Sequence, residues 1–211
     1  MKMDIMEIVK RRIEEFNTLG NVGFTVFDFS PFLKLKIKAT LWSELAFCIS
    51  TANSSAISGL YFQKRLENFE LQDANIMRVE RLLKAAGVRF YSRKAKYVVD
   101  ALLNFDNVYR ILRLRDKKAR ELLVKTVKGL GYKEASHFLR NVGRKDVAII
   151  DRHILRWLYE KDYIDKVPSN VGKRTYLELE TILKDLSYDR GISLAELDLI
   201  LWYEKTKKIL K

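Results

Sequence analysis

The chain has 211 residues, with 40 lysines and arginines against 27 acidic residues, and its net charge is +13 at neutral pH. Its 48% of hydrophobic residues can bury a globular core, which excludes a disordered tail, and its single cysteine, Cys48, excludes an internal disulfide, a cysteine-ligated iron–sulfur cluster and a cysteine-based zinc site. The positive charge is typical of proteins that bind a phosphate-rich partner, although ribosome-associated proteins and proteins of anionic membrane surfaces share it.

Helical periodicity runs through almost the whole chain. The pair Ser30-Pro31 predicts a helix N-cap followed by proline at the first helical position. The apolar runs 24–29 and 147–150 have the length of strands, but neither can form a sheet alone. We therefore predict an all-α fold. The predicted helices, in chain order, span residues 7–16, 41–50, 73–86, 93–105, 117–127, 133–141, 153–161 and 175–186, and a capping box at 193 opens a last helix.

No internal repeat or Gly/Ser linker divides the chain, so we predict a single unit over residues 1–211. No long uncharged apolar run occurs, and a charged amphipathic pattern follows residues 1–4 directly. This pattern predicts an intracellular protein without membrane contact. The one cysteine and two histidines are too few to favour a structural metal, and we expect no metal and no organic cofactor.

A glycine-rich hairpin, Lys128-Gly129-Leu130-Gly131-Tyr132-Lys133, lies between two predicted helices. Glycine permits positive φ and close backbone approach, so the amides around Gly129 and Gly131 can point at a phosphate, and the positive end of the next helix adds to the attraction. The same helix dipole disfavours the charged form of Lys133. A neutral lysine amine can attack a sugar C1′, expel the base and form a Schiff base.

Asp151 follows the apolar run 147–150 and precedes a predicted helix. Its carboxylate could stabilise positive charge that develops on the sugar, or move protons between steps. Considered singly, each residue also has a plainer interpretation: Lys133 as a solvated phosphate contact and Asp151 as a helix N-cap. Their joint presence favours the catalytic interpretation.

The segment Gly129-Leu130-Gly131-Tyr132-Lys133, with Asp151-Arg152-His153-Ile154 downstream, resembles the helix-hairpin-helix, glycine/proline-rich loop and aspartate signature of the DNA glycosylase superfamily that includes endonuclease III. The segment Phe90-Tyr91-Ser92-Arg93-Lys94-Ala95 resembles the start of another helix in that superfamily. The resemblance implies two helical lobes with a cleft between them: residues 1–50 with 146–211, and residues 51–145 with the hairpin 128–133. It also implies that a hairpin lysine nicks the strand by β-elimination after it removes the base.

The chain lacks the four C-terminal cysteines of the iron–sulfur members. Its length and its last residues, Trp202-Tyr203-Glu204-Lys205 to Leu210-Lys211, resemble most the short 8-oxoguanine DNA glycosylases of archaea and some thermophilic bacteria. The resemblance implies a bifunctional glycosylase/AP lyase of base excision repair that acts as a monomer on damaged double-stranded DNA, in the cytoplasm and associated with the nucleoid. In that subfamily the C-terminal lysine helps to distinguish 8-oxoguanine from guanine, which implies this role for Lys211.

A pocket for an extruded purine needs aromatic faces and a few polar groups. We expect Trp202 and Phe90 to stack on the base and Lys211 to contact its polar edge, with Pro31 as a further lining residue. The plainer interpretations are a core position for Trp202, beside Leu197 and other apolar residues, and a helix start for Pro31.

The DNA-facing surface is expected to contact phosphates through cations and amides, and to touch the partner of the flipped base through one polar side chain. Its plainer interpretations are a solvated charged face, a half-buried histidine at 153 and an ordinary helix-capping turn at 53. The candidate DNA-binding residues are Lys128, Gly129, Gly131, Arg93, Lys94, His153 and Asn53.

Two other functions remain open. The chain could be a helix-hairpin-helix module that binds DNA without catalysis, in which case Lys133 would form no covalent adduct. It could also be a glycosylase for another oxidised or alkylated base, which activity on a panel of lesions would reveal.

Overall fold

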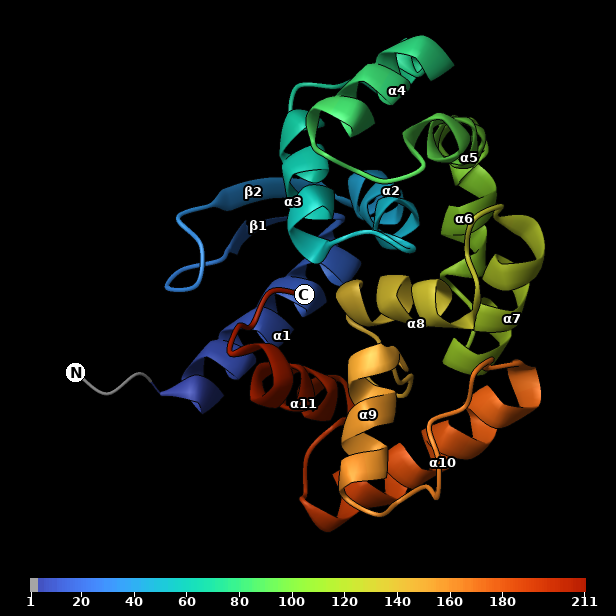
Figure 1. Ribbon diagram of the computed structural model, residues 1–211. Coiled ribbons are helices and arrows are strands. Elements are labelled where there is room, and N and C mark those ends of the chain that lie inside the picture. Colours follow the sequence, from blue (N-terminus) through green and yellow to red (C-terminus); the bar gives the residue numbers. More distant parts are fainter. Residues whose placement is uncertain (1–3) are drawn as a thin grey trace.

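The computed structural model describes residues 4–211, and helices dominate it (Figure 1). The fold is all-α, as predicted, with a small antiparallel hairpin near the start of the chain. The elements, in chain order, are α1 (Ile5–Val22), β1 (Phe24–Asp28), β2 (Lys36–Thr40), α2 (Leu41–Thr51), α3 (Ala56–Arg65), the 3-10 turn η1 (Leu71–Asp73), α4 (Ile76–Ala85), α5 (Tyr91–Leu103), α6 (Phe105–Ile111), α7 (Asp116–Thr126), α8 (Tyr132–Asn141), α9 (Arg152–Glu160), α10 (Lys173–Asp189) and α11 (Leu194–Thr206).

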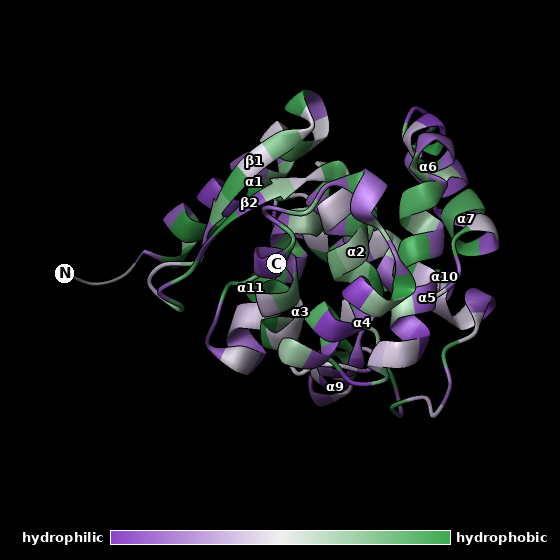
Figure 2. Cartoon of the chain, turned by 90° about the horizontal axis from the view of Figure 1, so that it is seen from above, coloured by the Kyte–Doolittle hydropathy of each residue, from purple (hydrophilic) through white to green (hydrophobic). Residues whose placement is uncertain are grey.

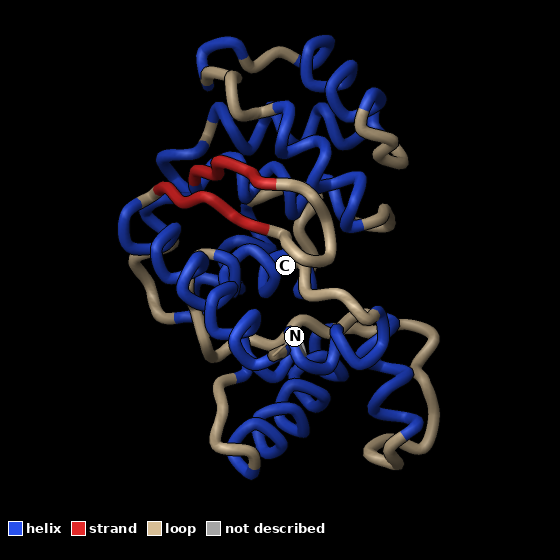
Figure 3. Tube along the Cα trace, turned by 90° about the vertical axis from the view of Figure 1, so that its left-hand side faces the viewer, coloured by secondary structure: helices blue, strands red, loops and turns tan. Residues whose placement is uncertain are grey.

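The β1–β2 hairpin corrects two sequence predictions. The run 24–29 does form a strand, because Lys36–Thr40 pairs with it in antiparallel register, with Phe24 opposite Thr40 (Figure 3). The peptide bond between Ser30 and Pro31 is cis and lies in the connection between the strands, so the predicted helix start is wrong. The second apolar run, 147–150, is a buried loop and no strand.

Helices α3 and α6 were missed by the sequence prediction. Ser55 caps α3 by accepting a hydrogen bond from the Ser58 backbone at 3.0 Å. Gly59 brings α3 against α2, because a Cβ at this position would lie 2.6 Å from Thr51. The position of α3 therefore depends on close packing against α2, and not on a regular stripe of apolar residues that the sequence would show.

The buried apolar side chains form two clusters. The first contains side chains of α1, the β1–β2 hairpin and α2 to α8, and the second joins α9, α10 and α11. Figure 1 shows α9, α10 and α11 at one end of the molecule and α3, α4 and α5 at the other. Apolar and polar segments alternate along most helices, as expected for amphipathic helices around buried cores (Figure 2). The division into lobes of residues 1–50 with 146–211, and of 51–145, stays a prediction.

Helix α11 contributes to both clusters. Leu199 belongs to the first cluster, whereas Leu197 and Leu201 belong to the second. This position leaves Asp198 and Trp202, which are four residues apart and therefore on one face of the helix, free to line a cavity between the clusters.

The connection between α7 and α8 is the predicted helix-hairpin-helix. Gly129 has φ +89°, and a Cβ there would lie 2.8 Å from the Tyr97 ring on α5. The Gly131 amide donates to Glu134 Oε2 at 3.2 Å, which caps the start of α8. The hairpin thus needs glycine at position 129, both for its backbone conformation and for its approach to α5.

Candidate active site

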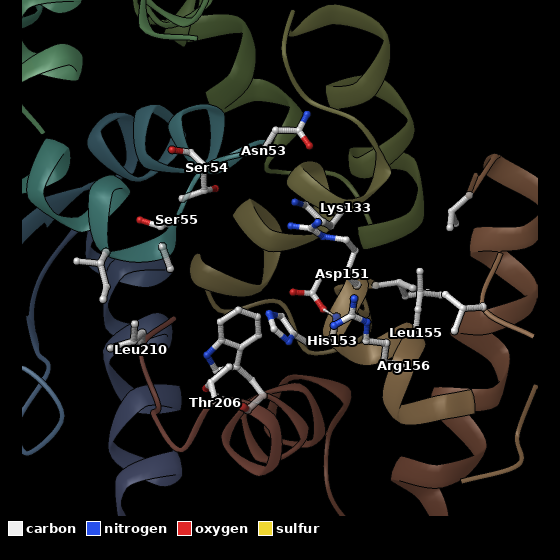
Figure 4. A pocket seen from close by; sticks show the side chains of 18 of the residues that line it. Asn53, Ser54, Ser55, Lys133, Asp151, His153, Leu155, Arg156, Thr206 and Leu210 are labelled. Carbon is white, nitrogen blue, oxygen red and sulfur yellow. Dashed lines mark hydrogen bonds between the residues drawn. The ribbon is translucent and has the colours of Figure 1, made fainter. Parts of the chain in front are cut away.

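An open cleft of about 890 Å³ separates the start of α8 and α9 from the loop between α2 and α3. Figure 4 shows Lys133, Asp151 and His153 close together in it, with Asn53, Ser54 and Ser55 across from them. A deeper recess of about 100 Å³ adjoins the cleft. The two cavities share lining residues from four parts of the chain, namely Thr51, Ser54, Ala56, Lys133, Asp151 and Trp202.

Lys133 is the second residue of α8 and lines both cavities. Its side chain is 32% exposed, and its Nζ lies 3.0 Å from Glu134 Oε1. The other oxygen of Glu134 accepts the Gly131 amide, so the hairpin and the lysine are held by one carboxylate. The structure therefore presents the amine of Lys133 to the cavity from a fixed helix start.

Asp151 is the N-cap of α9, and its Oδ1 accepts the backbone amides of His153 at 2.8 Å and Ile154 at 3.0 Å. The plainer interpretation from the sequence is therefore confirmed. The same residue also lines both cavities with Lys133, so a capping carboxylate and a hairpin lysine face one space.

Trp202 lines both cavities and is not simply a core residue. Its ring contacts His153 edge to face, with 4.9 Å between ring centroids. Its indole Nε1 is buried, and no group within residues 4–211 accepts its hydrogen. A buried N–H without a partner is costly, which points to a role in binding a ligand with a hydrogen-bond acceptor.

Lys211 is buried at the wall of the recess. Its Nζ donates to Glu44 Oε2 at 2.6 Å and to Gln63 Oε1 at 2.5 Å, and lies 4.0 Å from the centroid of the Phe27 ring. Burial lowers the pKa of Lys211 to about 8, and the Glu44 carboxylate opposes that shift. The side chain is thus fixed by a socket of two polar groups and aromatic faces.

A polar network that the sequence analysis did not identify extends from this socket. Asn141 donates to Glu44 Oε1 at 2.6 Å, and Arg140 Nε donates to the Asn141 side chain at 2.9 Å. Arg140 Nη1 then lies 2.7 Å from Asp198 Oδ2. The available signal was the pair of polar residues at 140–141, at the end of a helix whose neighbouring positions are apolar.

The candidate DNA-facing residues do not all lie at the surface. Lys128 and Arg93 are exposed, and Asn53, with φ 52°, lines the cleft. Lys94 is 5% exposed and donates to the Ser50 carbonyl at 2.7 Å, so its predicted surface position is wrong. The carbonyl, at the end of α2, offers the lysine an internal partner in place of a phosphate.

Phe90 and Pro31 lie outside both cavities. Phe90 is 57% exposed with φ 57°, just before α5, and Arg89 lies against its ring. Pro31 is exposed in the connection between β1 and β2. Neither is among the residues that line the cleft or the recess. Sequence analysis missed four cleft cations: Arg89, Arg152, Arg156 and Lys208.

Within residues 4–211, no helix has the length and apolar composition that a membrane span requires. In the same part of the chain, no three His, Cys, Asp or Glu side chains gather in an arrangement suited to a metal ion.

A hairpin lysine and a downstream capping aspartate at one cleft, in an all-α fold, define a helix-hairpin-helix DNA glycosylase. The chain belongs to the Ogg-HhH family of 8-oxoguanine DNA glycosylases, whose model matches residues 22–192.

Similar proteins cover nearly the whole chain. An 8-oxoguanine DNA glycosylase/AP lyase of Methanocaldococcus jannaschii is 44% identical over 99% of this chain and 94% of its own length. One from Aquifex aeolicus is also 44% identical, over 99% of this chain and 95% of its own. The crystal structure of the M. jannaschii enzyme with a 15mer DNA that contains 8-oxoguanine superposes with a TM-score of 0.85 at 43% identity, covering 99% of this chain and 94% of that one.

Proposed function

We propose that this protein is a bifunctional glycosylase/AP lyase that removes 8-oxoguanine from duplex DNA in base excision repair. The observation that carries the proposal is the convergence of Lys133 and Asp151 on the same two cavities. The names of the M. jannaschii and A. aeolicus relatives, both 8-oxoguanine DNA glycosylase/AP lyases, support the lesion and the second activity.

The duplex would be held by phosphate contacts around the cleft. The exposed cations Lys128 and Arg93 and the amide of Gly129 would contact phosphates without reading sequence, whereas the amide of Gly131 already donates to Glu134 Oε2. His153 would contact a phosphate beside the extruded nucleotide, and Asn53 the partner base, because both line the cleft. Arg152 and Arg156 extend the same basic surface.

The extruded base would enter the recess. Trp202 offers an aromatic face and an unpaired N–H, and Lys211 lines the same recess. The roles of Phe90 and Pro31 at the base and of Lys94 at the phosphates stay predictions, and none of the three lines the cleft or the recess.

Lys133 would attack C1′ of the flipped nucleotide, and the bond to the base would break with its electron pair on the base. Asp151 would stabilise the positive charge that develops on the sugar, since its carboxylate lines the cavity beside the amine. The sugar ring then opens: the C1′–O4′ bond breaks, O4′ takes a proton, and the nitrogen loses one, which leaves a C1′=N Schiff base. This Schiff base acidifies the C2′ hydrogen, whose removal breaks the C3′–O bond and cleaves the strand by β-elimination.

Borohydride trapping tests this proposal. Wild-type protein should give a covalent adduct on a duplex with 8-oxoguanine, Lys133→Gln should give none, and Lys128→Gln should bind more weakly but still be trapped. If an adduct forms only with an oxidised pyrimidine or an alkylated purine, that base and not 8-oxoguanine is the substrate. If the protein binds DNA but forms no adduct, it is a DNA-binding module without this catalysis.

We also infer that the protein works as a monomer on chromosomal DNA inside a prokaryotic cell. The basic composition and the prokaryotic sources of the relatives support this inference. Light scattering of the free protein and of its DNA complex measures the number of subunits.

A further inference from the structure

The recess is lined by more ionisable groups than a lysine nucleophile and a stabilising carboxylate require. These groups come from α8, the start of α9, α11 and the end of the chain. They are Lys133, His137, Arg140, Asp151, Asp198 and Lys211.

Neighbouring groups constrain three of these residues. Asp151 accepts two backbone amides of α9. Lys211 is fixed between Glu44 and Gln63. Burial lowers the pKa of His137 well below its usual value, and the positive charge of Arg140 adds to that shift, so this imidazole is neutral.

Asp198 differs from the other groups of the recess. It projects from α11 with 12% of its side chain exposed, and only Oδ2 contacts Arg140, at 2.7 Å. The pKa of Asp198 is raised to about 7: burial is the main cause, Arg140 opposes the rise, and the nearby Asp151 carboxylate adds to it. Asp198 can therefore hold a proton in the recess at neutral pH and release it there.

The chemistry of base removal needs such a proton. The purine leaves with the electron pair of its bond to C1′, and a proton on the base makes it a better leaving group. General acids of this kind contribute about 10²–10⁴-fold to rate when their pKa lies near the working pH.

We propose that Asp198 is the general acid that protonates the departing base. The carboxyl hydrogen passes to a ring atom of the purine as the bond from the base to C1′ breaks and the bond from the Lys133 nitrogen to C1′ forms. Asp198 is left as a carboxylate, and Arg140 neutralises it. This inference rests on the proposed function, because it assigns the leaving-group proton in the same reaction.

Arg140 is built to hold that carboxylate. Its Nε donates to Asn141 at 2.9 Å, and its guanidinium lies 4.9 Å from the centroid of the Phe16 ring. The arginine is buried, so it cannot turn toward solvent when Asp198 is neutral. The pair therefore stays in place through both protonation states.

The test compares two substrates for one variant. Asp198→Asn keeps the shape of the side chain and an oxygen for Arg140 but has no acidic proton. In single-turnover reactions, it should slow excision of 8-oxoguanine by at least about 100-fold, and it should slow cleavage at a ready-made abasic site far less, because no base departs there. Asp185→Asn, an exposed change on α10, is the matched control.

The pH profile provides a second readout. Wild-type excision should fall as pH rises above about 7, where Asp198 loses its proton. This fall should be absent for the abasic substrate and for Asp198→Asn, and Asp198→Glu should restore part of the rate. Three outcomes would each overturn the general-acid role. Asp198→Asn could slow the reaction equally on the 8-oxoguanine and abasic substrates, or its excision rate could still fall above pH 7. Alternatively, wild-type excision could become faster as Asp198 loses its proton. Trapping of wild-type protein reports separately on Lys133.

Discussion

Arg120 on α7 and Glu180 on α10 form a buried two-pronged ion pair, with Nη1 2.5 Å from Oε1 and Nη2 2.8 Å from Oε2. Glu180 Oε1 also accepts the Ala148 amide at 3.0 Å. This carboxylate therefore fixes the loop that leads to Asp151 against α7, the first helix of the helix-hairpin-helix.

Glu180→Gln should destabilise the fold by about 3–5 kcal/mol, because it leaves the buried guanidinium of Arg120 without its charged partner. Chemical denaturation measures the loss. The matched control is Glu178→Gln, two residues before Glu180 on the same helix, which breaks an exposed ion pair with Arg174. That change should cost about 0.5 kcal/mol or less. Similar losses of unfolding free energy in both variants would show that the buried Arg120–Glu180 ion pair stabilises the fold no more than an exposed one.

Asp151→Asn should separate capping from catalysis. Asparagine caps a helix nearly as well as aspartate, so the free energy of unfolding should change by less than about 0.5 kcal/mol. Excision should nevertheless fall strongly, because the neutral amide cannot stabilise positive charge on the sugar. Asp151→Ala should lose about 1 kcal/mol of stability in addition. Normal excision by the asparagine variant would reduce Asp151 to a structural cap.

Gly129→Ala should weaken both the fold and DNA binding. The residue has φ +89°, and the new Cβ would lie 2.8 Å from Tyr97, so the hairpin must shift. The unfavourable backbone conformation alone costs about 1–2 kcal/mol. Gly172→Ala, where φ is −73° and no atom lies within 4 Å, is the control; it should lose only the difference between glycine and alanine as the N-cap of α10. Calorimetry and DNA titration measure the two effects.

Arg152→Ala and Arg156→Ala should weaken binding to damaged and undamaged duplexes alike. Both residues line the cleft, and a phosphate contact carries no sequence information. Each lost contact should reduce the slope of log affinity against log salt by about 1. Arg174→Ala, on an exposed face of α10, should leave this slope unchanged. An effect limited to damaged duplex would instead place the arginine at the extruded base.

Stability should also depend on pH through Asp198. Its pKa rises from 3.8 to about 7 on folding, so between these values the folded state binds more protons than the unfolded state. The contribution of Asp198 is therefore present at low pH and is lost as pH rises through about 7. Asp198→Asn has no such titration. The unfolding free energy of the wild type, relative to that of this variant, should therefore decrease as pH rises from 4 to 7.

The hairpin lysine and Asp151 could be predicted because each lies in a short contiguous motif whose local conformation follows from its own residues. Helical periodicity likewise predicts the all-α class. The inward course of Lys94 could not be predicted, since it depends on the Ser50 carbonyl of another helix. The same holds for Asp198, whose partner Arg140 is 58 residues away in sequence. Pro31 was misplaced because the pairing of β1 with β2, and not local propensity, decides its surroundings.

Helix α11 carries Leu199 into one core and Leu197 and Leu201 into the other, while Asp198 and Trp202 line the recess. The residues that would recognise the lesion are thus interleaved with residues that hold the molecule together. A lineage that acquires a new lesion preference through this helix can vary few positions without loosening either core. Changes of preference should therefore accumulate more readily at the rim of the cleft, around residues 53–55 and 167–171, than on α11.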